Sequence, residues 1–154
     1  MAWTLTGSLH DYLAAAGHFL RSRPVRNTVQ LVALDSLVVR GLAAFGDVAP
    51  LFGWWRAGDG EVTAALLHTP PYPVLLTRLP AACAGELAEA LVGRGRQLTG
   101  VNAEQSDAEA FAAAWSGLTG SGWHEFRRSR LFQLGRLGYR QVEERVVLEF
   151  GAPG

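Results

Sequence analysis

The sequence has no lysine and no isoleucine, and only one cysteine, Cys83, among its 154 residues. A single cysteine excludes an internal disulfide and any zinc site built from several cysteines, which is typical of proteins from a reducing compartment. All 14 basic side chains are arginine, while alanine, glycine and valine are abundant. We attribute this bias to a GC-rich genome rather than to a need for guanidinium chemistry.

The sequence also lacks a charge excess and a long apolar run. Its formal net charge is zero, whereas a nucleic-acid-binding protein is expected to show a clustered basic excess. The one dense cluster, Arg127, Arg128 and Arg130, fits an exposed strand face. No apolar run reaches the ~20 residues of a membrane helix, and residues 1–7 do not resemble a signal peptide. We therefore expect a cytoplasmic protein that binds neither nucleic acid nor membrane.

The length of the chain predicts one domain. The residue pattern in its first part predicts a short strand over 3–6 and two helices. Ser8 followed by Asp11 resembles a capping box, and apolar residues at helical spacing continue to Leu20. Pro24 is a natural first-turn residue for the second helix. Apolar positions cover more than one face of that helix, so we expect it to be well buried. These positions are Val29, Leu31, Val32, Leu34, Leu37 and Val38.

From Pro50 onward the pattern becomes that of strands. Gly58-Asp59-Gly60 is typical of a hairpin turn, and Pro80 opens a further helix. The expected order is strands over 51–56, 62–69 and 74–79, a helix over 81–92, a strand over 98–101, a helix over 106–118, and strands over 123–134 and 142–150.

An aromatic group lies on the first of these strands and the segments after it. Strand alternation predicts that Trp54 and Trp55 point to opposite faces, so that one serves the core while the other contacts a helix, a ligand or a partner. Core packing and a binding surface are both open at this point. The candidate substrate-binding residues are Trp54, Trp55, His68 and Tyr72.

The element order and several segments resemble the GNAT family of acyl-CoA-dependent N-acetyltransferases, in particular the degenerate amino-terminal half of actinobacterial tandem members. The matching segments are R-P-V-R-N-T-V from Arg23, P-L-F-G-W-W-R from Pro50, L-H-T-P-P-Y-P from Leu67, G-V-N-A from Gly100, A-E-A-F-A-A-A-W from Ala108 and R-L-F-Q-L-G-R-L from Arg130. The tail from Leu137 resembles the last strands of a catalytic half. The resemblance implies a single α+β domain over 1–154. It would have a mixed, mostly antiparallel sheet flanked by about four helices, with its last strand from 137–150.

The resemblance also implies where acetyl-CoA would bind. In the family, the pyrophosphate lies on backbone amides of a Q/R-x-x-G-x-G/A loop at the start of a helix, where N–H groups and the helix dipole hold the anion. The matching window keeps Arg78, but Ala81 and Cys83 replace the glycines and Pro80 has no N–H. Amides of 77–79 would steady the acetyl carbonyl. The candidate cofactor-binding residues are Thr77, Arg78, Leu79, Ala81, Ala82, Cys83, Ala84 and Gly85.

The family's general acid is often a tyrosine in N-x-x-A-x-x-L/F-Y, and alignment on Ala108 and Phe111 puts Ala112 at that position. Tyr139 is the one weak candidate left for this role, although it also matches a structural Gly-aromatic pair. Two interpretations of Cys83 are open. Its side chain is either a thiolate favoured by the helix dipole or a packing residue. The four histidines show no metal-ligand spacing, so we expect no metal.

Two functions remain open from the sequence. The first is an N-acetyltransferase that transfers an acyl group from acetyl-CoA to an amine of a small molecule or a protein. The second is a noncatalytic GNAT-like module for packing, dimerisation or ligand sensing, with a homodimer as one arrangement. The family resemblance favours the first function, whereas the altered loop and the missing tyrosine favour the second.

Overall fold

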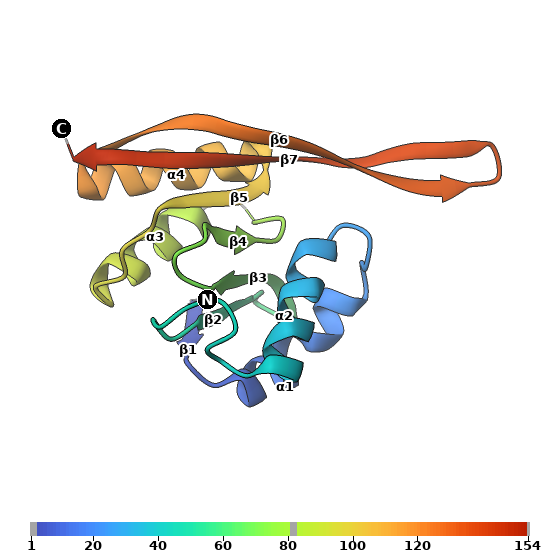
Figure 1. Ribbon diagram of the computed structural model, residues 1–154, viewed down its shortest axis with the longest axis horizontal. Coiled ribbons are helices and arrows are strands. Elements are labelled where there is room, and N and C mark those ends of the chain that lie inside the picture. Colours follow the sequence, from blue (N-terminus) through green and yellow to red (C-terminus); the bar gives the residue numbers. More distant parts are fainter. Residues whose placement is uncertain (1–2, 81–82, 154) are drawn as a thin grey trace.

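A computed structural model describes residues 3–80 and 83–153 of the chain. The elements are β1 (Trp3–Thr6), α1 (Leu9–Arg21), α2 (Thr28–Arg40), β2 (Leu51–Arg56), β3 (Val62–His68), β4 (Val74–Leu76), α3 (Cys83–Gly93), β5 (Gly100–Glu104), α4 (Gln105–Thr119), β6 (Ser121–Gly135) and β7 (Gly138–Pro153). In the described residues they form a seven-stranded, mostly antiparallel sheet with four helices (Figure 1). The α+β class expected from the sequence is confirmed, and the arrangement is consistent with a GNAT-like layout.

The strands lie side by side in the order β1-β2-β3-β4-β5-β7-β6. The β4–β5 pair is parallel, and it is short: Val74 lies opposite Val101 and Leu75 opposite Asn102. The neighbouring pairs are antiparallel. The carboxy-terminal strand β7 lies between β5 and β6, which confirms that the tail completes the sheet.

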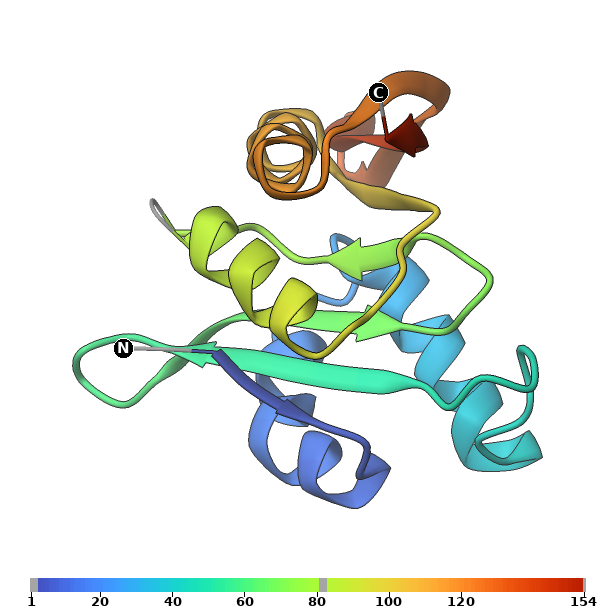
Figure 2. The same ribbon diagram turned by 90° about the vertical axis from the view of Figure 1, so that its left-hand side faces the viewer.

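The helices cover the two faces of the sheet in pairs (Figure 2). Along β3, Ala65 and Leu67 point to the core under α1 and α2, while Leu66 points to the core under α3 and α4. This alternation is what a strand buried on both faces requires. It also confirms that Trp54 and Trp55 point to opposite faces, and both are buried.

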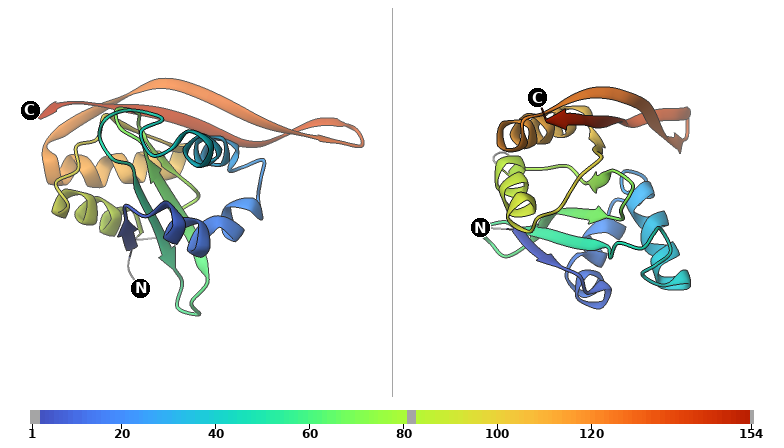
Figure 3. Two further views of the ribbon diagram at one scale, coloured as in Figure 1. Left: turned by 60° about the horizontal axis from the view of Figure 1, so that its bottom comes forward. Right: turned by 60° about the vertical axis from the view of Figure 1, so that its left-hand side comes forward.

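Strands β6 and β7 form a long ribbon that extends past the body of the protein (Figures 1 and 3). Its outer end, residues 132–139, carries exposed apolar side chains, among them Phe132, Leu134 and Tyr139. The expected exposed strand face lies nearer the body, where Arg128 and Arg130 pair with Glu144.

Three expectations about local structure are wrong. Helix α2 begins at Thr28 rather than near Pro24, because the chain first makes a separate turn in which the Asn27 amide donates to the Arg23 carbonyl at 3.0 Å. The helix is also not well buried, since only one face packs on the sheet. Val32 and Val38 are 62% and 58% exposed.

The third error concerns the strands next to the candidate cofactor loop. Strand β4 ends at Leu76 instead of continuing over 77–79, because Arg78 turns toward α4 and donates to Asp107. Strand β5 covers Gly100–Glu104 rather than 98–101, in register with β7. None of the helices in the described residues has the length and apolarity needed to cross a membrane.

Candidate functional site

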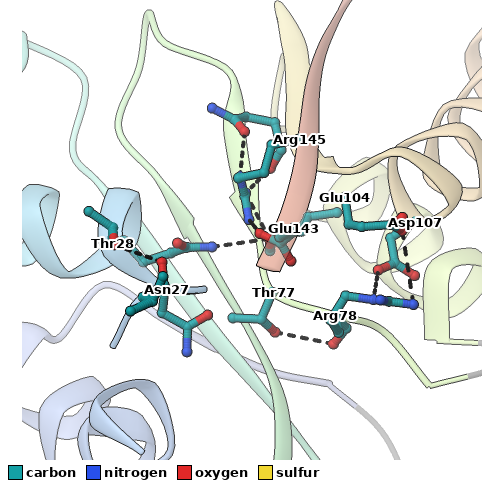
Figure 4. A network of polar contacts seen from close by, with 12 residues as sticks. Asn27, Thr28, Thr77, Arg78, Glu104, Asp107, Glu143 and Arg145 are labelled. Atoms are coloured by element: carbon teal, nitrogen blue, oxygen red, sulfur yellow. Dashed lines mark hydrogen bonds and ion pairs between the residues drawn. The ribbon is translucent and has the colours of Figure 1, made fainter. Parts of the chain in front are cut away.

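The residues that follow β4 are held by bonds within the chain. The Thr77 amide donates to the Ala65 carbonyl at 3.1 Å, and the Thr77 hydroxyl accepts from the Ala65 amide at 2.9 Å. Arg78 Nε donates to Asp107 Oδ2 at 2.8 Å. Burial raises the pKa of Asp107, although the charge of Arg78 opposes this. The Thr77 amide is therefore already engaged, and Figure 4 shows the Arg78 side chain directed at Asp107.

Arg145 links the end of β4 to β5. Its guanidinium donates from Nη2 to the Leu76 carbonyl at 3.0 Å and to the Asn102 carbonyl at 2.8 Å, and from Nε to Asn102 Oδ1 at 2.9 Å. Nη1 lies 3.2 Å from Glu143 Oε2, and both side chains are buried. Burial lowers the pKa of Arg145, while the Glu143 carboxylate opposes that shift. We call this set of contacts the Arg145 bridge (Figure 4).

Gln30 from α2 also reaches the Leu76 carbonyl, to which its Nε2 donates at 3.0 Å. That carbonyl therefore accepts two side-chain hydrogen bonds, which matches its two lone pairs. The Gln30 side chain is fully buried, and its Oε1 has no hydrogen-bond partner among the described residues.

Two adjoining cavities form a groove between the α1–α2 connection, the end of β4 and the ribbon. The larger has a volume of about 370 Å³ and the smaller about 270 Å³. Arg23 and Arg26 line both cavities, Arg78 lines the larger one and Arg140 the smaller one. We call this hollow the arginine groove. Its other lining residues are Phe19, Ser22, Pro24, Val25, Asn27, Thr63, Thr77, Gln133, Val142 and Glu143.

The remaining cofactor candidates are only partly placed. Ala81 and Ala82 lie outside the described residues. Cys83 is fully buried against Trp55 and Ala64. Burial, with a smaller contribution from Glu86, raises the pKa of the Cys83 thiol to about 11, so Cys83 serves packing. Ala84 packs at the edge of the α3 and α4 core, and a Cβ at Gly85 would meet open space.

The aromatic candidates are not brought together. Trp54, Trp55 and His68 are 8%, 6% and 1% exposed, so they belong to the core. Tyr72 is 55% exposed and its ring meets that of Phe45 edge-on at 5.9 Å. It lines a separate apolar cavity of about 410 Å³ between α2, β5 and β7.

Neither position considered for a general acid supplies one at the end of β4. Ala112 is fully buried in the core cluster that also contains Leu76. Tyr139 is 75% exposed on β7, where it pairs with Leu134 of β6 next to the turn of the ribbon. In the described residues, no group of three or more His, Cys, Asp or Glu side chains is placed to hold a metal ion.

His68 makes the stability of the fold depend on pH. Burial, together with the charge of Arg96, lowers its pKa from 6.5 to about 4. The unfolded chain therefore takes up the proton at higher pH, so this stability is complete above the unfolded pKa and is lost as pH falls toward the folded one. Between about pH 7.5 and about pH 5, unfolding should become easier by about 2 kcal/mol, measured by urea denaturation.

His68→Gln should remove that pH dependence, because glutamine does not titrate. His10→Gln is the matched control, since His10 is exposed, and it should keep the wild-type slope. An unchanged slope in His68→Gln would show that another group is responsible.

Sequence reasoning missed the residues of the Arg145 bridge and, apart from Thr77 and Arg78, those of the arginine groove. The signal for the bridge was present, because Glu143 and Arg145 are two apart on a strand, so they share one face just before the apolar run Val146–Leu148. No local sequence pattern identifies Asn102 or Gln30 as a hydrogen-bond partner in this region.

The comparisons with known proteins do not assign the chain to a family. No protein-family model matches the chain. No curated protein matches it significantly.

Proposed function

We propose that this chain is a noncatalytic module of GNAT-like layout that works by binding a ligand and does not transfer an acetyl group. The observation that carries the proposal is the Arg145 bridge, which ties the end of β4 to β5 with buried hydrogen bonds. A cofactor that entered between β4 and β5 would have to break this bridge. The buried polar groups of the bridge would then be left unpaired, which is strongly unfavourable.

The described residues around the candidate loop do not fit acetyl-CoA. An acetyl carbonyl held at 77–79 needs free N–H groups, but that of Thr77 already donates to the Ala65 carbonyl. Pro80 has no N–H to offer. Neither Thr77 nor Pro80 therefore has a free N–H for a thioester carbonyl.

The charge of the nearby groove also disfavours an amine acceptor. An aliphatic amine is protonated at neutral pH, and the arginine groove presents Arg23, Arg26, Arg78 and Arg140. Like charges in a partly buried site repel, which lowers the affinity for such a substrate.

Acetyl transfer from acetyl-CoA to a small-molecule or protein amine is the competing proposal, and the sequence resemblance supports it. The noncatalytic proposal and the acetyltransferase proposal make opposite predictions for acetyl-CoA binding. We expect no acetyl-CoA binding that depends on the loop at 78–83, measured by calorimetry and thermal shift at about 1 mM acetyl-CoA, a concentration that detects even weak binding. A positive control is a known acetyltransferase under the same buffer.

Micromolar binding that is lost in Ala82→Asp but kept in Ala113→Asp would overturn the noncatalytic proposal. Ala82 belongs to the loop matched by sequence, whereas Ala113 is exposed on α4. Thiol release on adding an amine would establish the transferase instead.

A further inference from the structure

The arginine groove has more positive charge than the chain neutralises. Arg78 is paired with Asp107, and the carboxylate of Glu143, which also lines the groove, is paired with Arg145. Among the described residues, Arg23, Arg26 and Arg140 have no carboxylate within ion-pair distance. Three guanidinium groups therefore face one hollow without a counter-charge from residues 3–80 or 83–153.

Two uncharged polar side chains, Thr63 and Asn27, also line the larger cavity of the groove. Thr63 Oγ1 is buried in the wall of the larger cavity and has no hydrogen-bond partner among the described residues. Asn27 is 5% exposed and lines the same cavity. It stands at the N-cap of α2, yet its side chain donates to the Leu20 carbonyl and makes no capping bond to the helix. The positive end of the α2 dipole thus adds to the charge beside the groove.

The groove is bounded by two parts of the chain that are distant in sequence. Arg23 and Arg26 lie on the connection between α1 and α2, and Arg140 lies on β7 in the ribbon. A ligand that contacts both would join the ribbon to the helical layer. Guanidinium groups are suited to this because each can bind a carboxylate or phosphate with two parallel hydrogen bonds.

We propose that the arginine groove binds a compact anion with two or more negative charges, carried by carboxylate or phosphate groups. Its charges would be met by Arg23, Arg26 and Arg140, and the cavity volume suits a ligand of metabolite size. This inference rests on the proposed binding function and names the ligand class of that function.

The test is calorimetric titration of the full chain with inorganic pyrophosphate and with citrate at low salt, with spermidine as a cationic control. We expect heat and a thermal shift with one or both anions and none with spermidine. Binding should weaken as salt is added, because salt screens these charges. Pyrophosphate alone would identify a phosphate ligand, and citrate alone a carboxylate ligand; both results support the proposal.

Variants show whether the anion binds in the groove. Arg23→Gln with Arg26→Gln should weaken binding by about tenfold or more. Arg40→Gln with Arg136→Gln removes the same charge from exposed positions outside the groove and should leave binding within about twofold. Arg140→Glu tests the ribbon side of the site separately, and urea denaturation confirms that each variant is folded.

Equal weakening in the two double variants, or no binding of either anion at about 5 mM, would overturn the proposal. Acetyl-CoA is itself an anion, so it is titrated into the same variants. If its binding is lost only in the Arg23 and Arg26 variant, it is acting as a polyanion in the groove. If its binding is lost only in Ala82→Asp, the noncatalytic function fails, while the groove is judged from pyrophosphate and citrate.

Discussion

Replacing Arg145 with methionine should lower the free energy of unfolding by about 3–5 kcal/mol, the usual effect of removing one partner of a buried ion pair. Glu143 would remain as a buried charge without its counter-ion, and the carbonyls of Leu76 and Asn102 would each lose a hydrogen bond. Urea denaturation followed by circular dichroism measures the change.

Two further variants separate the effect of breaking the Arg145–Glu143 pair from the general effect of losing an arginine. Arg130→Met changes an exposed arginine on β6 and should alter stability by less than about 1 kcal/mol. Adding Glu143→Gln to Arg145→Met should recover part of the loss, because it removes the stranded charge. If Arg145→Met and Arg130→Met were equally stable, the Arg145 bridge would not hold the end of β4 to β5.

Gly100→Ala should destabilise the protein by about 3 kcal/mol or more, or prevent folding. A Cβ at Gly100 would lie 2.4 Å from the Leu148 carbonyl oxygen and 3.3 Å from Glu149 Cα. Both atoms belong to the backbone of β7, so a side-chain rotation cannot relieve the contact. Strands β5 and β7 would have to move apart where Gly100 pairs with Glu149. Thermal unfolding and the yield of folded protein give the measurement.

Gly117→Ala is the matched control for this substitution. Gly117 lies in α4, and a Cβ there would meet no atom within 4 Å. Alanine should stabilise that helix by about 0.5–1 kcal/mol. A Gly100→Ala variant as stable as the wild type would mean that β5 and β7 are not in this register.

Local patterns were enough to predict most of the elements. The Ser8 cap is confirmed, since Ser8 Oγ accepts from the Asp11 amide at 3.1 Å. Alternation correctly assigned Trp54 and Trp55 to different faces. The burial of α2 was overestimated because an apolar helix pattern does not reveal how much sheet is available to cover it, and Val32 and Val38 stay exposed.

The site was harder to predict than the fold because its contacts join distant positions. Arg145 meets Leu76 across 69 positions and Asn102 across 43, and no local pattern records such partners. The arginine groove depends in the same way on how close the ribbon lies to the α1–α2 connection. The end of β4 was placed too late because the bond from Arg78 to Asp107 ends the strand, and that bond spans 29 positions.

The position of β7 between β5 and β6 has a consequence for synthesis of the protein on the ribosome. Strands β5 and β6 do not pair with each other, so among the described residues β5 keeps one unpaired edge and β6 has no partner strand until β7 arrives. Open strand edges recruit other chains, and the nascent chain exposes these edges until β7 has left the exit tunnel. A premature stop within β7 would therefore release a product with unpaired strand edges, which is a substrate for chaperones and proteases rather than a smaller working protein.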